Sequence, residues 1–197
     1  MKTKKEIKPY RPVYPSPAAL ITSVDAKGRA NIITLGEVFN ISIREPVILG
    51  IAIRPATYSH GLISGTKEFA VNLPTVDMLE KVDRCGMVSG RSGKDKFREI
   101  GLTPVPSTRI RPPCIEECPV NIECEVMDIL RVGDHDLFLG NVVAMRVDED
   151  KLDEKGDMLN ETLDPIVYIT GQYWSIGRPM GALYFSVEKN REGGVEQ

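Results

Sequence analysis

The most constraining feature of this sequence is a segment in which apolar and polar residues alternate strictly. Its apolar members are Val120, Ile122, Cys124 and Val126, and its polar members are Asn121, Glu123 and Glu125. A period of two is typical of a β-strand with one dry and one wet face. The alternation falters over 127–129, which predicts a bulge. After the turn at 133–136, the apolar run 137–147 predicts a long returning strand.

Two β-branched runs near the start of the chain predict an antiparallel hairpin. They cover 18–24 and 30–35, and the short loop between them ends in Gly28, which can adopt the positive φ that such loops require. The segment 36–46 shows no sustained period, and we interpret it as an irregular or single-turn connection. The run 47–53 is almost wholly apolar, so it predicts a strand that is buried on both faces or nearly so.

Short helices are predicted between the strands. The first follows Thr57 as its N-cap and stops at Gly65. The second opens at Thr75 and ends near Gly86, because apolar residues recur at three-residue spacing from Val76 onward. A third covers 94–100, with Gly101 after its last turn, and the proline-rich segment 102–119 predicts an extended surface connection.

Together these elements predict the fold class. Further short strands are expected over 68–73, 166–170 and 182–187, and 148–164 is expected to be a charged loop. The strands follow one another without a helix after each, so an all-β to α+β antiparallel barrel with a few short helices fits better than a parallel sheet. We expect one domain over 1–197, with mobile ends at 1–9 and 190–197.

Charge and composition exclude several partner classes. With 25 Lys+Arg, 28 Asp+Glu and a net charge of −3, the chain has no excess of positive charge for nucleic acid. No stretch approaches the roughly 20 apolar residues that cross a bilayer, and the polar start is unlike a signal peptide, so we expect a soluble cytoplasmic protein. The four cysteines are expected to be reduced, and their spacing does not favour a metal site. Cys85 lies in a polar Gly/Ser-rich stretch where a thiol could be reachable.

The segment from Arg54 to His60 is the first candidate site. It places a fixed cation, three hydroxyl groups and an imidazole at the predicted start of a helix, where free backbone N–H groups favour a phosphate monoester. The alternative is an ordinary capped surface helix. The segment from Asn31 to Glu37 is the second candidate, because a strand end can offer backbone groups and an apolar wall to a planar ring such as a flavin. Its alternative is a simple strand end with a turn.

Several segments, taken in order, resemble the flavin reductase-like family. They are PSPAALITSV at 15–24, GRANIIT at 28–34, REPVILGIAIR at 44–54, TYSH at 57–60 and EFAVNLP at 68–74. Three more resemble its flavoredoxin branch, namely CGMVSGRSGKDKF at 85–97, IEECPVNIEC at 115–124 and GDHDLFLGNVV at 133–143. The resemblance implies an FMN-binding Greek-key split β-barrel, usually a homodimer, with FMN held non-covalently.

The resemblance also implies roles for individual residues. Those expected to line the ring and ribityl chain of FMN are Asn31, Thr34, Leu35, Gly36, Glu37 and Asn40. Those expected to take its phosphate are Arg54, Thr57, Tyr58, Ser59 and His60. Those expected to close over the cofactor are Ser89, Gly90 and Lys96, while Tyr173 and Trp174 would stack near it or lie at the subunit interface. His135 would lie near the nicotinamide-facing side of the flavin; its alternative is a hairpin-turn residue.

The implied activity is hydride transfer from NADH or NADPH to FMN, with electrons passed on to free flavin, ferric iron or a partner protein. An electron carrier of the flavoredoxin type, reduced by a partner protein, needs the same cradle and stays an alternative. A third hypothesis is a binding module without redox function.

Overall fold

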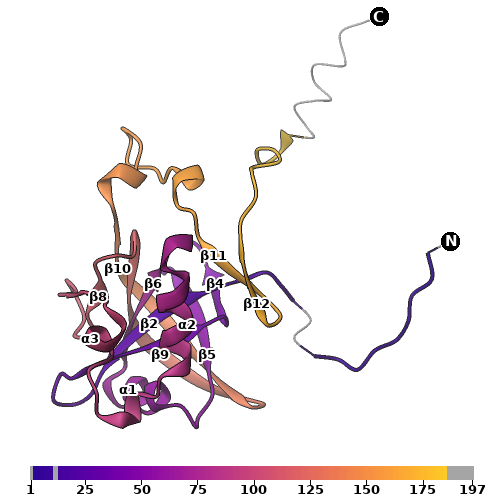
Figure 1. Ribbon diagram of the computed structural model, residues 1–197. Helices are drawn as coiled ribbons and strands as arrows, with labels where there is room; N and C mark the ends of the chain where they lie inside the picture. Colours follow the sequence, from indigo (N-terminus) through magenta and orange to yellow (C-terminus); the bar gives the residue numbers. More distant parts are fainter. Residues whose placement is uncertain (1, 11–12, 186–197) are drawn as a thin grey trace, which may run out of the picture.

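The computed structural model describes residues 2–10 and 13–185 and is built around a seven-stranded antiparallel sheet (Figure 1). The strand order is β3-β2-β6-β9-β10-β5-β4. The bounds are β2 (Ala19–Val24), β3 (Ala30–Leu35), β4 (Val38–Ser42), β5 (Ile48–Ile53), β6 (Glu68–Leu73), β9 (Val120–Val132) and β10 (His135–Val147). A smaller sheet joins β1 (Ser16–Pro17), β11 (Ile166–Ile169) and β12 (Gln172–Ser175), and a third pairs β7 (Pro104–Val105) with β8 (Cys114–Ile115).

Three short helices decorate the sheet. They are α1 (Tyr58–Thr66), α2 (Leu79–Met87) and α3 (Lys96–Ile100). Single 3-10 turns occur at η1 (Val76–Met78), η2 (Gly90–Ser92), η3 (Glu149–Lys151) and η4 (Asn160–Thr162). In Figure 1, α2 lies across the sheet, while the segment carrying η3 and η4 stands away from it. The antiparallel pairing and the few short helices confirm the predicted secondary-structure class.

The two edge strands of the large sheet, β3 and β4, are consecutive in the chain. Only Gly36 and Glu37 separate them, yet β4 pairs with β5 and not with β3. The carbonyl of Glu37 accepts a hydrogen bond from the amide of Ala52 at 3.0 Å, which turns the chain from one edge to the other. The sheet therefore curls until its edges approach at this link, and it leaves a split between them.

The predicted hairpin and first helix are confirmed, with one correction. Gly28 has a φ of 80° in the loop between β2 and β3. Thr57 caps α1, and its hydroxyl accepts a hydrogen bond from the amide of His60 at 3.2 Å. Gly65 does not stop the helix, because the chain continues to Thr66 and closes on Lys67 in the left-handed conformation. Gly86 likewise lies within α2 and not after it.

Three strand predictions need correction. The irregular connection expected at 36–46 contains β4, whose Phe39 covers the space that Gly50 leaves open on β5. The described part of 182–187 forms a turn at its start and no strand, while 186–187 lie outside the described residues. The sequence reading missed β12, which pairs with β11. The expected bulge in β9 is confirmed, because Met127 has no partner between Val126 and Asp128.

The face of β9 that was expected to be wet is partly buried. Glu123 is fully buried, and its carboxylate accepts hydrogen bonds from the amides of Thr108 and Arg109 at 2.8 and 2.7 Å. Burial alone would raise the pKa of Glu123, but these hydrogen bonds, with the charge of Arg146, hold it below its ordinary value. The segment 102–119 thus folds back over β9, and it buries Ile110 among other residues, so it is not simply a surface connection.

The cysteines are free and buried. Cys85, expected to be reachable, has no exposed surface, and burial raises the pKa of its thiol to about 11 although Lys96 and Arg84 pull it down. Within the described residues, no helix is long and apolar enough to cross a membrane.

Candidate functional site

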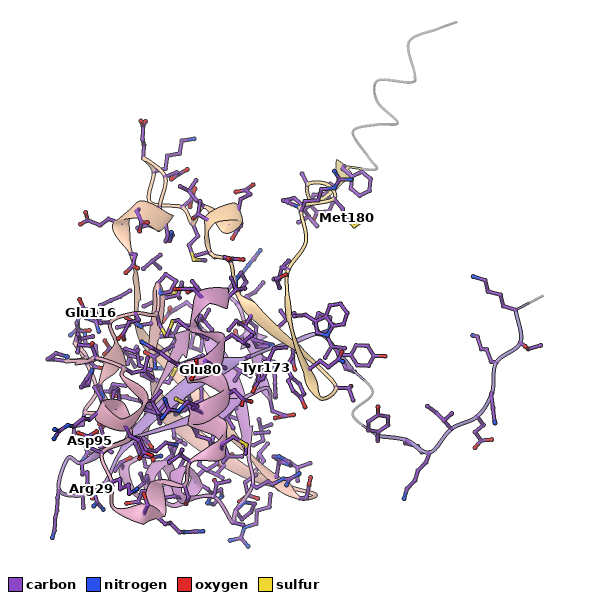
Figure 2. All side chains as sticks on the ribbon, viewed as in Figure 1. Arg29, Glu80, Asp95, Glu116, Tyr173 and Met180 are labelled. Atoms are coloured by element: carbon purple, nitrogen blue, oxygen red, sulfur yellow. The ribbon has the colours of Figure 1, made fainter. Side chains whose placement is uncertain are left out.

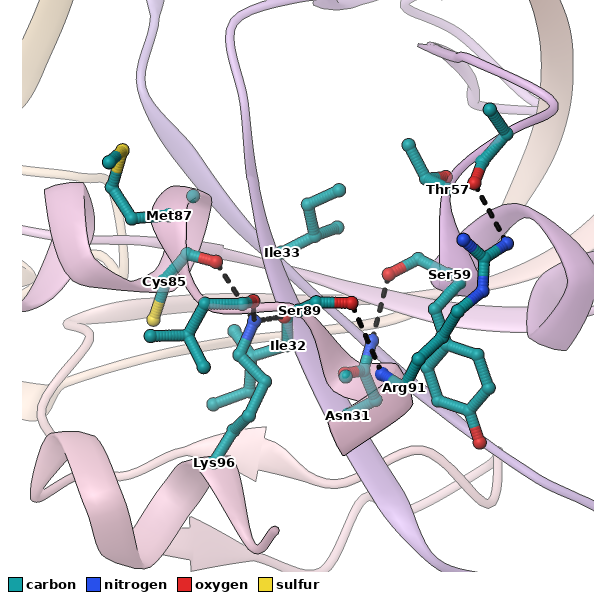
Figure 3. A pocket seen from close by; sticks show the side chains of 15 residues that line it. Asn31, Ile32, Ile33, Thr57, Ser59, Cys85, Met87, Ser89, Arg91 and Lys96 are labelled. Atoms are coloured by element: carbon teal, nitrogen blue, oxygen red, sulfur yellow. Dashed lines mark hydrogen bonds between the residues drawn. The ribbon is translucent and has the colours of Figure 1, made fainter. Parts of the chain in front are cut away.

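A pocket beside the start of α1 gathers many of the predicted site residues (Figure 3). We call it the helix pocket; it is lined by residues 31–33 of β3, 56–59 at the start of α1, 85–91 around the end of α2, and Lys96. It brings together the predicted residues Asn31, Thr57, Tyr58, Ser59, Ser89, Gly90 and Lys96. Its volume of about 200 Å³ is below the roughly 300 Å³ of a small ligand site, so it can hold one end of a larger ligand.

A buried polar pair forms the inner wall of the helix pocket. The Nδ2 atom of Asn31 donates to Oγ of Ser59 at 2.8 Å, and both side chains are almost completely buried. The Oδ1 atom of Asn31 is also buried and has no hydrogen-bond partner. A Cβ atom on Gly90 would lie 2.1 Å from this oxygen and 2.6 Å from the ring of Tyr58. Only glycine therefore fits at position 90 without displacing the wall.

Lys96 occupies the floor of the helix pocket and is buried. Its Nζ donates to the carbonyls of Ile32, Cys85 and Val88 at 2.6, 2.9 and 2.7 Å, as the dashed lines in Figure 3 show. An ammonium group has three protons, so these three bonds use its whole donor capacity. Burial lowers the pKa of Lys96 below its ordinary value. The side chain adds a positive charge to the pocket but keeps no proton for a ligand.

Two guanidinium groups lie near the mouth of this pocket, and neither was singled out from the sequence. Arg91 lines the pocket, and its Nη2 donates to the carbonyl of Ala56 at 2.8 Å. Nη2 of Arg29 donates to the hydroxyl of Tyr58 at 3.2 Å. Arg91 belongs to the segment 85–97 that resembles the flavoredoxin branch. Its contact with Ala56, before α1, joins residues 35 positions apart, and no local sequence pattern reveals such a contact.

A second hollow follows β3 toward its end, and we call it the tyrosine recess. Its lining includes the predicted Thr34, Gly36, Glu37 and Tyr173 (Tyr173 is labelled in Figure 2), together with Ala18, Gly86 and Tyr168. The two tyrosine rings meet edge to face at 5.8 Å. Tyr173 donates to Oδ1 of Asp83 at 3.2 Å, and burial together with the charge of Asp83 raises its pKa to about 12. The hydroxyl of Thr34 donates a hydrogen bond to the carbonyl of Val82 at 2.5 Å.

A third and larger hollow includes His135 in its lining, and we call it the His135 cleft. It has a volume of about 640 Å³ and is lined by Tyr10, Glu37, Phe39, Ala52, Arg54, Val132, Asp134, His135 and Leu137. The carboxylate of Asp134 lies 2.8 Å from Nδ1 of His135 and 3.9 Å from Nη2 of Arg54. The hydrogen bond to His135 lowers the pKa of Asp134, and Arg54 adds to the effect.

The remaining predicted residues do not line the helix pocket. Arg54 lies in the His135 cleft, and His60 is half-buried with its Nε2 atom 2.8 Å from Oδ2 of Asp136. Leu35 packs in the core that the strands of the large sheet form with α1, and Asn40 is exposed on β4. Trp174 is 51% exposed on β12, which fits a surface residue as well as a ligand contact. Of the residues predicted to bind the phosphate, Thr57, Tyr58 and Ser59 thus line the helix pocket, Arg54 lines the His135 cleft, and His60 lines neither.

The three hollows are connected through shared residues. Gly86 lines both the helix pocket and the tyrosine recess, and Glu37 lines both the tyrosine recess and the His135 cleft. The connected lining follows β3 from Asn31 to the link at Gly36 and Glu37. The lining therefore runs from the start of α1, past the two tyrosines, to His135.

The chain belongs to the flavin reductase family, since the model of the flavin reductase like domain matches residues 10–177. An uncharacterized protein of Pyrococcus abyssi is 36% identical over 141 residues, covering 72% of this chain and 79% of the relative. The NADH:riboflavin 5'-phosphate oxidoreductase of Streptomyces pristinaespiralis is 30% identical over 132 residues, covering 66% of this chain and 70% of the relative.

Solved structures share the architecture. The flavoredoxin of Desulfovibrio vulgaris (Miyazaki F) superposes with a TM-score of 0.86 at 26% identity, covering 94% of this chain and 100% of the flavoredoxin. A split-barrel-domain protein of Shewanella frigidimarina superposes with a TM-score of 0.77 at 18% identity, covering 85% of each chain. The split β-barrel predicted from the sequence is confirmed.

Proposed function

We propose that this protein binds FMN in the connected hollows along β3 and acts as an NAD(P)H-dependent flavin oxidoreductase. The continuity of the lining through Gly86 and Glu37 carries this proposal, because a phosphorylated tricyclic ring needs a narrow polar end and a longer planar slot in one line. The names of relatives support the choice, since one is an NADH:riboflavin 5'-phosphate oxidoreductase and another a flavoredoxin.

The residues present fit the phosphate end of such a ligand. The first turn of α1 offers amide N–H groups, Arg91 offers a guanidinium beside them, and Lys96 adds charge from below. The unpartnered Oδ1 of Asn31 is an acceptor without a donor, which a ribityl hydroxyl can supply. Gly90 keeps the space between this oxygen and Tyr58 free of a side chain.

The residues farther along hold the ring and the reaction face. Tyr168 and Tyr173 form one wall, and the backbone at Gly36 and Glu37 borders the other side. Bound there, the flavin supplies an acceptor for hydride from NADH or NADPH and a source of electrons for free flavin, ferric iron or a protein partner. His135 and Arg54 then lie in the cleft open to the nucleotide, where the guanidinium of Arg54 and the ring N–H of His135 can orient its phosphates.

The first test is the visible spectrum of the purified protein, followed by titration with FMN and riboflavin. A flavin spectrum, or quenching of FMN fluorescence with saturable binding, is expected. A colourless protein whose addition leaves FMN fluorescence unchanged would reject the proposal and favour a binding module without redox function.

The second candidate is an electron carrier of the flavoredoxin type, favoured by the superposition on the Desulfovibrio flavoredoxin. Steady-state oxidation of NADH and NADPH, with FMN or ferricyanide as acceptor, separates the two. Turnover supports the reductase; a yellow protein inert to both nucleotides supports the carrier, reduced by a partner protein.

We also propose that the protein works in the cytoplasm as a homodimer. The described chain exposes apolar side chains on one edge strand, Phe39 and Ile41, and next to it Ile43. Covering such an edge is a common reason for association. Light scattering coupled to size-exclusion chromatography is expected to give twice the chain mass of 21.9 kDa, and a mass equal to one chain would refute the dimer.

A further inference from the structure

The ammonium of Lys96 donates to three carbonyls that come from two distant parts of the chain. Its ammonium bonds Ile32 on β3, Cys85 inside α2 and Val88 just after α2. Cys85 and Val88 belong to the carbonyl end of α2, where helices leave acceptors unpaired and carry a partial negative charge. The buried cation is thus compensated by oriented carbonyl dipoles, and it ties the end of α2 to β3.

The residues that follow this tie form the mouth of the helix pocket. Ser89 accepts a hydrogen bond from the amide of Arg91 at 3.3 Å, and Gly90 packs against Asn31 and Tyr58. Without an ammonium at position 96, three carbonyl oxygens that converge on one point would lose their donor and repel one another. The turn at 89–91 would then lose the anchor that fixes its start.

From these contacts we propose that Lys96 is a positioning residue that shapes the 85–91 segment for an anionic ligand without touching that ligand. The inference rests on the proposed function, since the anion in question is the phosphate of FMN. It replaces the role expected from the sequence, direct closure over the cofactor, because all three protons of the ammonium are already bonded to the backbone.

The charge of Lys96 makes the positioning dependent on pH. Two titratable groups act on this charge, the thiol of Cys85 on α2 and the carboxylate of Glu99 on α3, while β3 contributes the carbonyl of Ile32. Because burial lowers the pKa of Lys96, its ammonium loses the proton at a lower pH than an exposed lysine does. FMN affinity should therefore fall as pH rises toward about 10.4, and bound phosphate should raise the pKa of Lys96 in return.

The test compares Lys96→Met with the control Lys94→Met, since Lys94 is exposed in the same segment. Without any flavin, iodoacetamide labelling at one fixed pH is followed by peptide mass spectrometry. Cys85 is the first residue of the anchored segment and its thiol is buried, so in Lys96→Met it should label about tenfold faster or more. Cys114, Cys118 and Cys124 report global unfolding, and they should stay slow.

The second readout is the affinity for FMN and for riboflavin, which lacks the phosphate. Lys96→Met should weaken FMN by about tenfold or more and riboflavin by less, while Lys94→Met should change neither. Unchanged labelling of Cys85 together with unchanged FMN affinity would overturn the inference. Equal losses for both flavins would reduce Lys96 to a general structural role.

Two further outcomes keep the inference testable. If all four cysteines label rapidly in Lys96→Met, that variant has unfolded and the wild-type protein is used in its place. The ratio of its affinities for FMN and for riboflavin is then measured as a function of pH. A ratio that falls as pH rises supports the role of the ammonium, and a flat ratio refutes it. Should the protein bind no flavin at all, the proposed function fails while the labelling of Cys85 still decides whether Lys96 anchors the segment.

Discussion

The helix pocket and the His135 cleft lie at opposite ends of the same connected lining, and they are built differently. In the helix pocket the polar groups of Asn31, Ser59 and Lys96 are buried and bonded to one another or to the backbone. In the His135 cleft the charged side chains of Arg54 and Asp134 are 65% and 78% exposed. The first is fixed before any ligand arrives, and the second keeps its charges in water.

This difference teaches how one site can hold one ligand and exchange another. A wall whose groups are already ordered loses little conformational entropy on binding, so it favours affinity. An open cleft with solvated charges binds weakly and releases quickly, as a nucleotide that leaves after each turnover requires. Variants in the helix pocket should therefore change the affinity for FMN, and variants in the His135 cleft should change the kinetic constants for the nucleotide.

Gly90→Val should have the largest effect. Its side chain would enter the space between Asn31 and Tyr58, where a Cβ atom alone comes within 2.1 Å of Oδ1 of Asn31. FMN affinity, measured by fluorescence quenching, should fall about a hundredfold or more. Gly61→Ala is the control, because nothing lies within 4 Å of its added Cβ atom in α1. Tight FMN binding by Gly90→Val would place the phosphate outside the helix pocket.

Arg91→Ala should weaken FMN binding by about 1–3 kcal/mol, the range for a charge-assisted contact to a phosphate. Riboflavin affinity should change little. The matched variant is Arg54→Ala, which should leave FMN affinity within about twofold and raise KM for the nucleotide, since Arg54 lies in the His135 cleft. The reverse pattern would restore the phosphate role that the sequence suggested for Arg54.

His135→Ala should lower kcat/KM for NADH or NADPH by about tenfold, because a half-buried side chain contributes less than a fully buried, oriented donor. FMN affinity should not change, and this forms the control within the same variant. Stopped-flow reduction of the bound flavin gives the rate directly. A loss of FMN affinity equal to that of Gly90→Val would mean that the two ends do not act separately.

Tyr173→Phe should have the smallest effect. It removes one hydrogen bond, 3.2 Å from Asp83, which is worth about 1 kcal/mol in unfolding free energy. The phenol stays protonated at neutral pH because its pKa is raised to about 12, so no charge is lost with the hydroxyl. Urea denaturation measures the change. A fall in nucleotide turnover without a change in stability would give Tyr173 a part in the reaction.

Much of the fold follows from local pattern. A few neighbouring residues determine each of three features, the positive φ of Gly28, the Thr57 cap and the bulge at Met127. Such features can therefore be predicted from the local sequence. The prediction of a solvent-exposed face on β9 was wrong for Glu123, because the segment around Thr108 and Arg109, 15 and 14 residues earlier in the chain, covers it. Polarity in the sequence reports the residue type and not what covers it.

The candidate site was predictable only in part. The motifs led to Asn31, Ser59 and Gly90, which the fold brings into one pocket. They also grouped Arg54 with Thr57, although the turn after β5 sends these neighbours to different hollows. Arg91 and the three carbonyls around Lys96 depend on contacts between distant segments, and such contacts leave no periodic signal.

The place of α1 in the connectivity sets when the site can form during folding. The hairpins β2–β3 and β4–β5 lie at opposite ends of the large sheet, and α1 is the connection that carries the chain from β5 across to β6, which pairs with β2. The helix pocket needs α1 to meet β3, so it closes only after these distant hairpins have been joined. Long-range joining is slower than hairpin formation. In refolding experiments, flavin capture should therefore trail the early gain of strand structure, and added flavin should not speed that first phase.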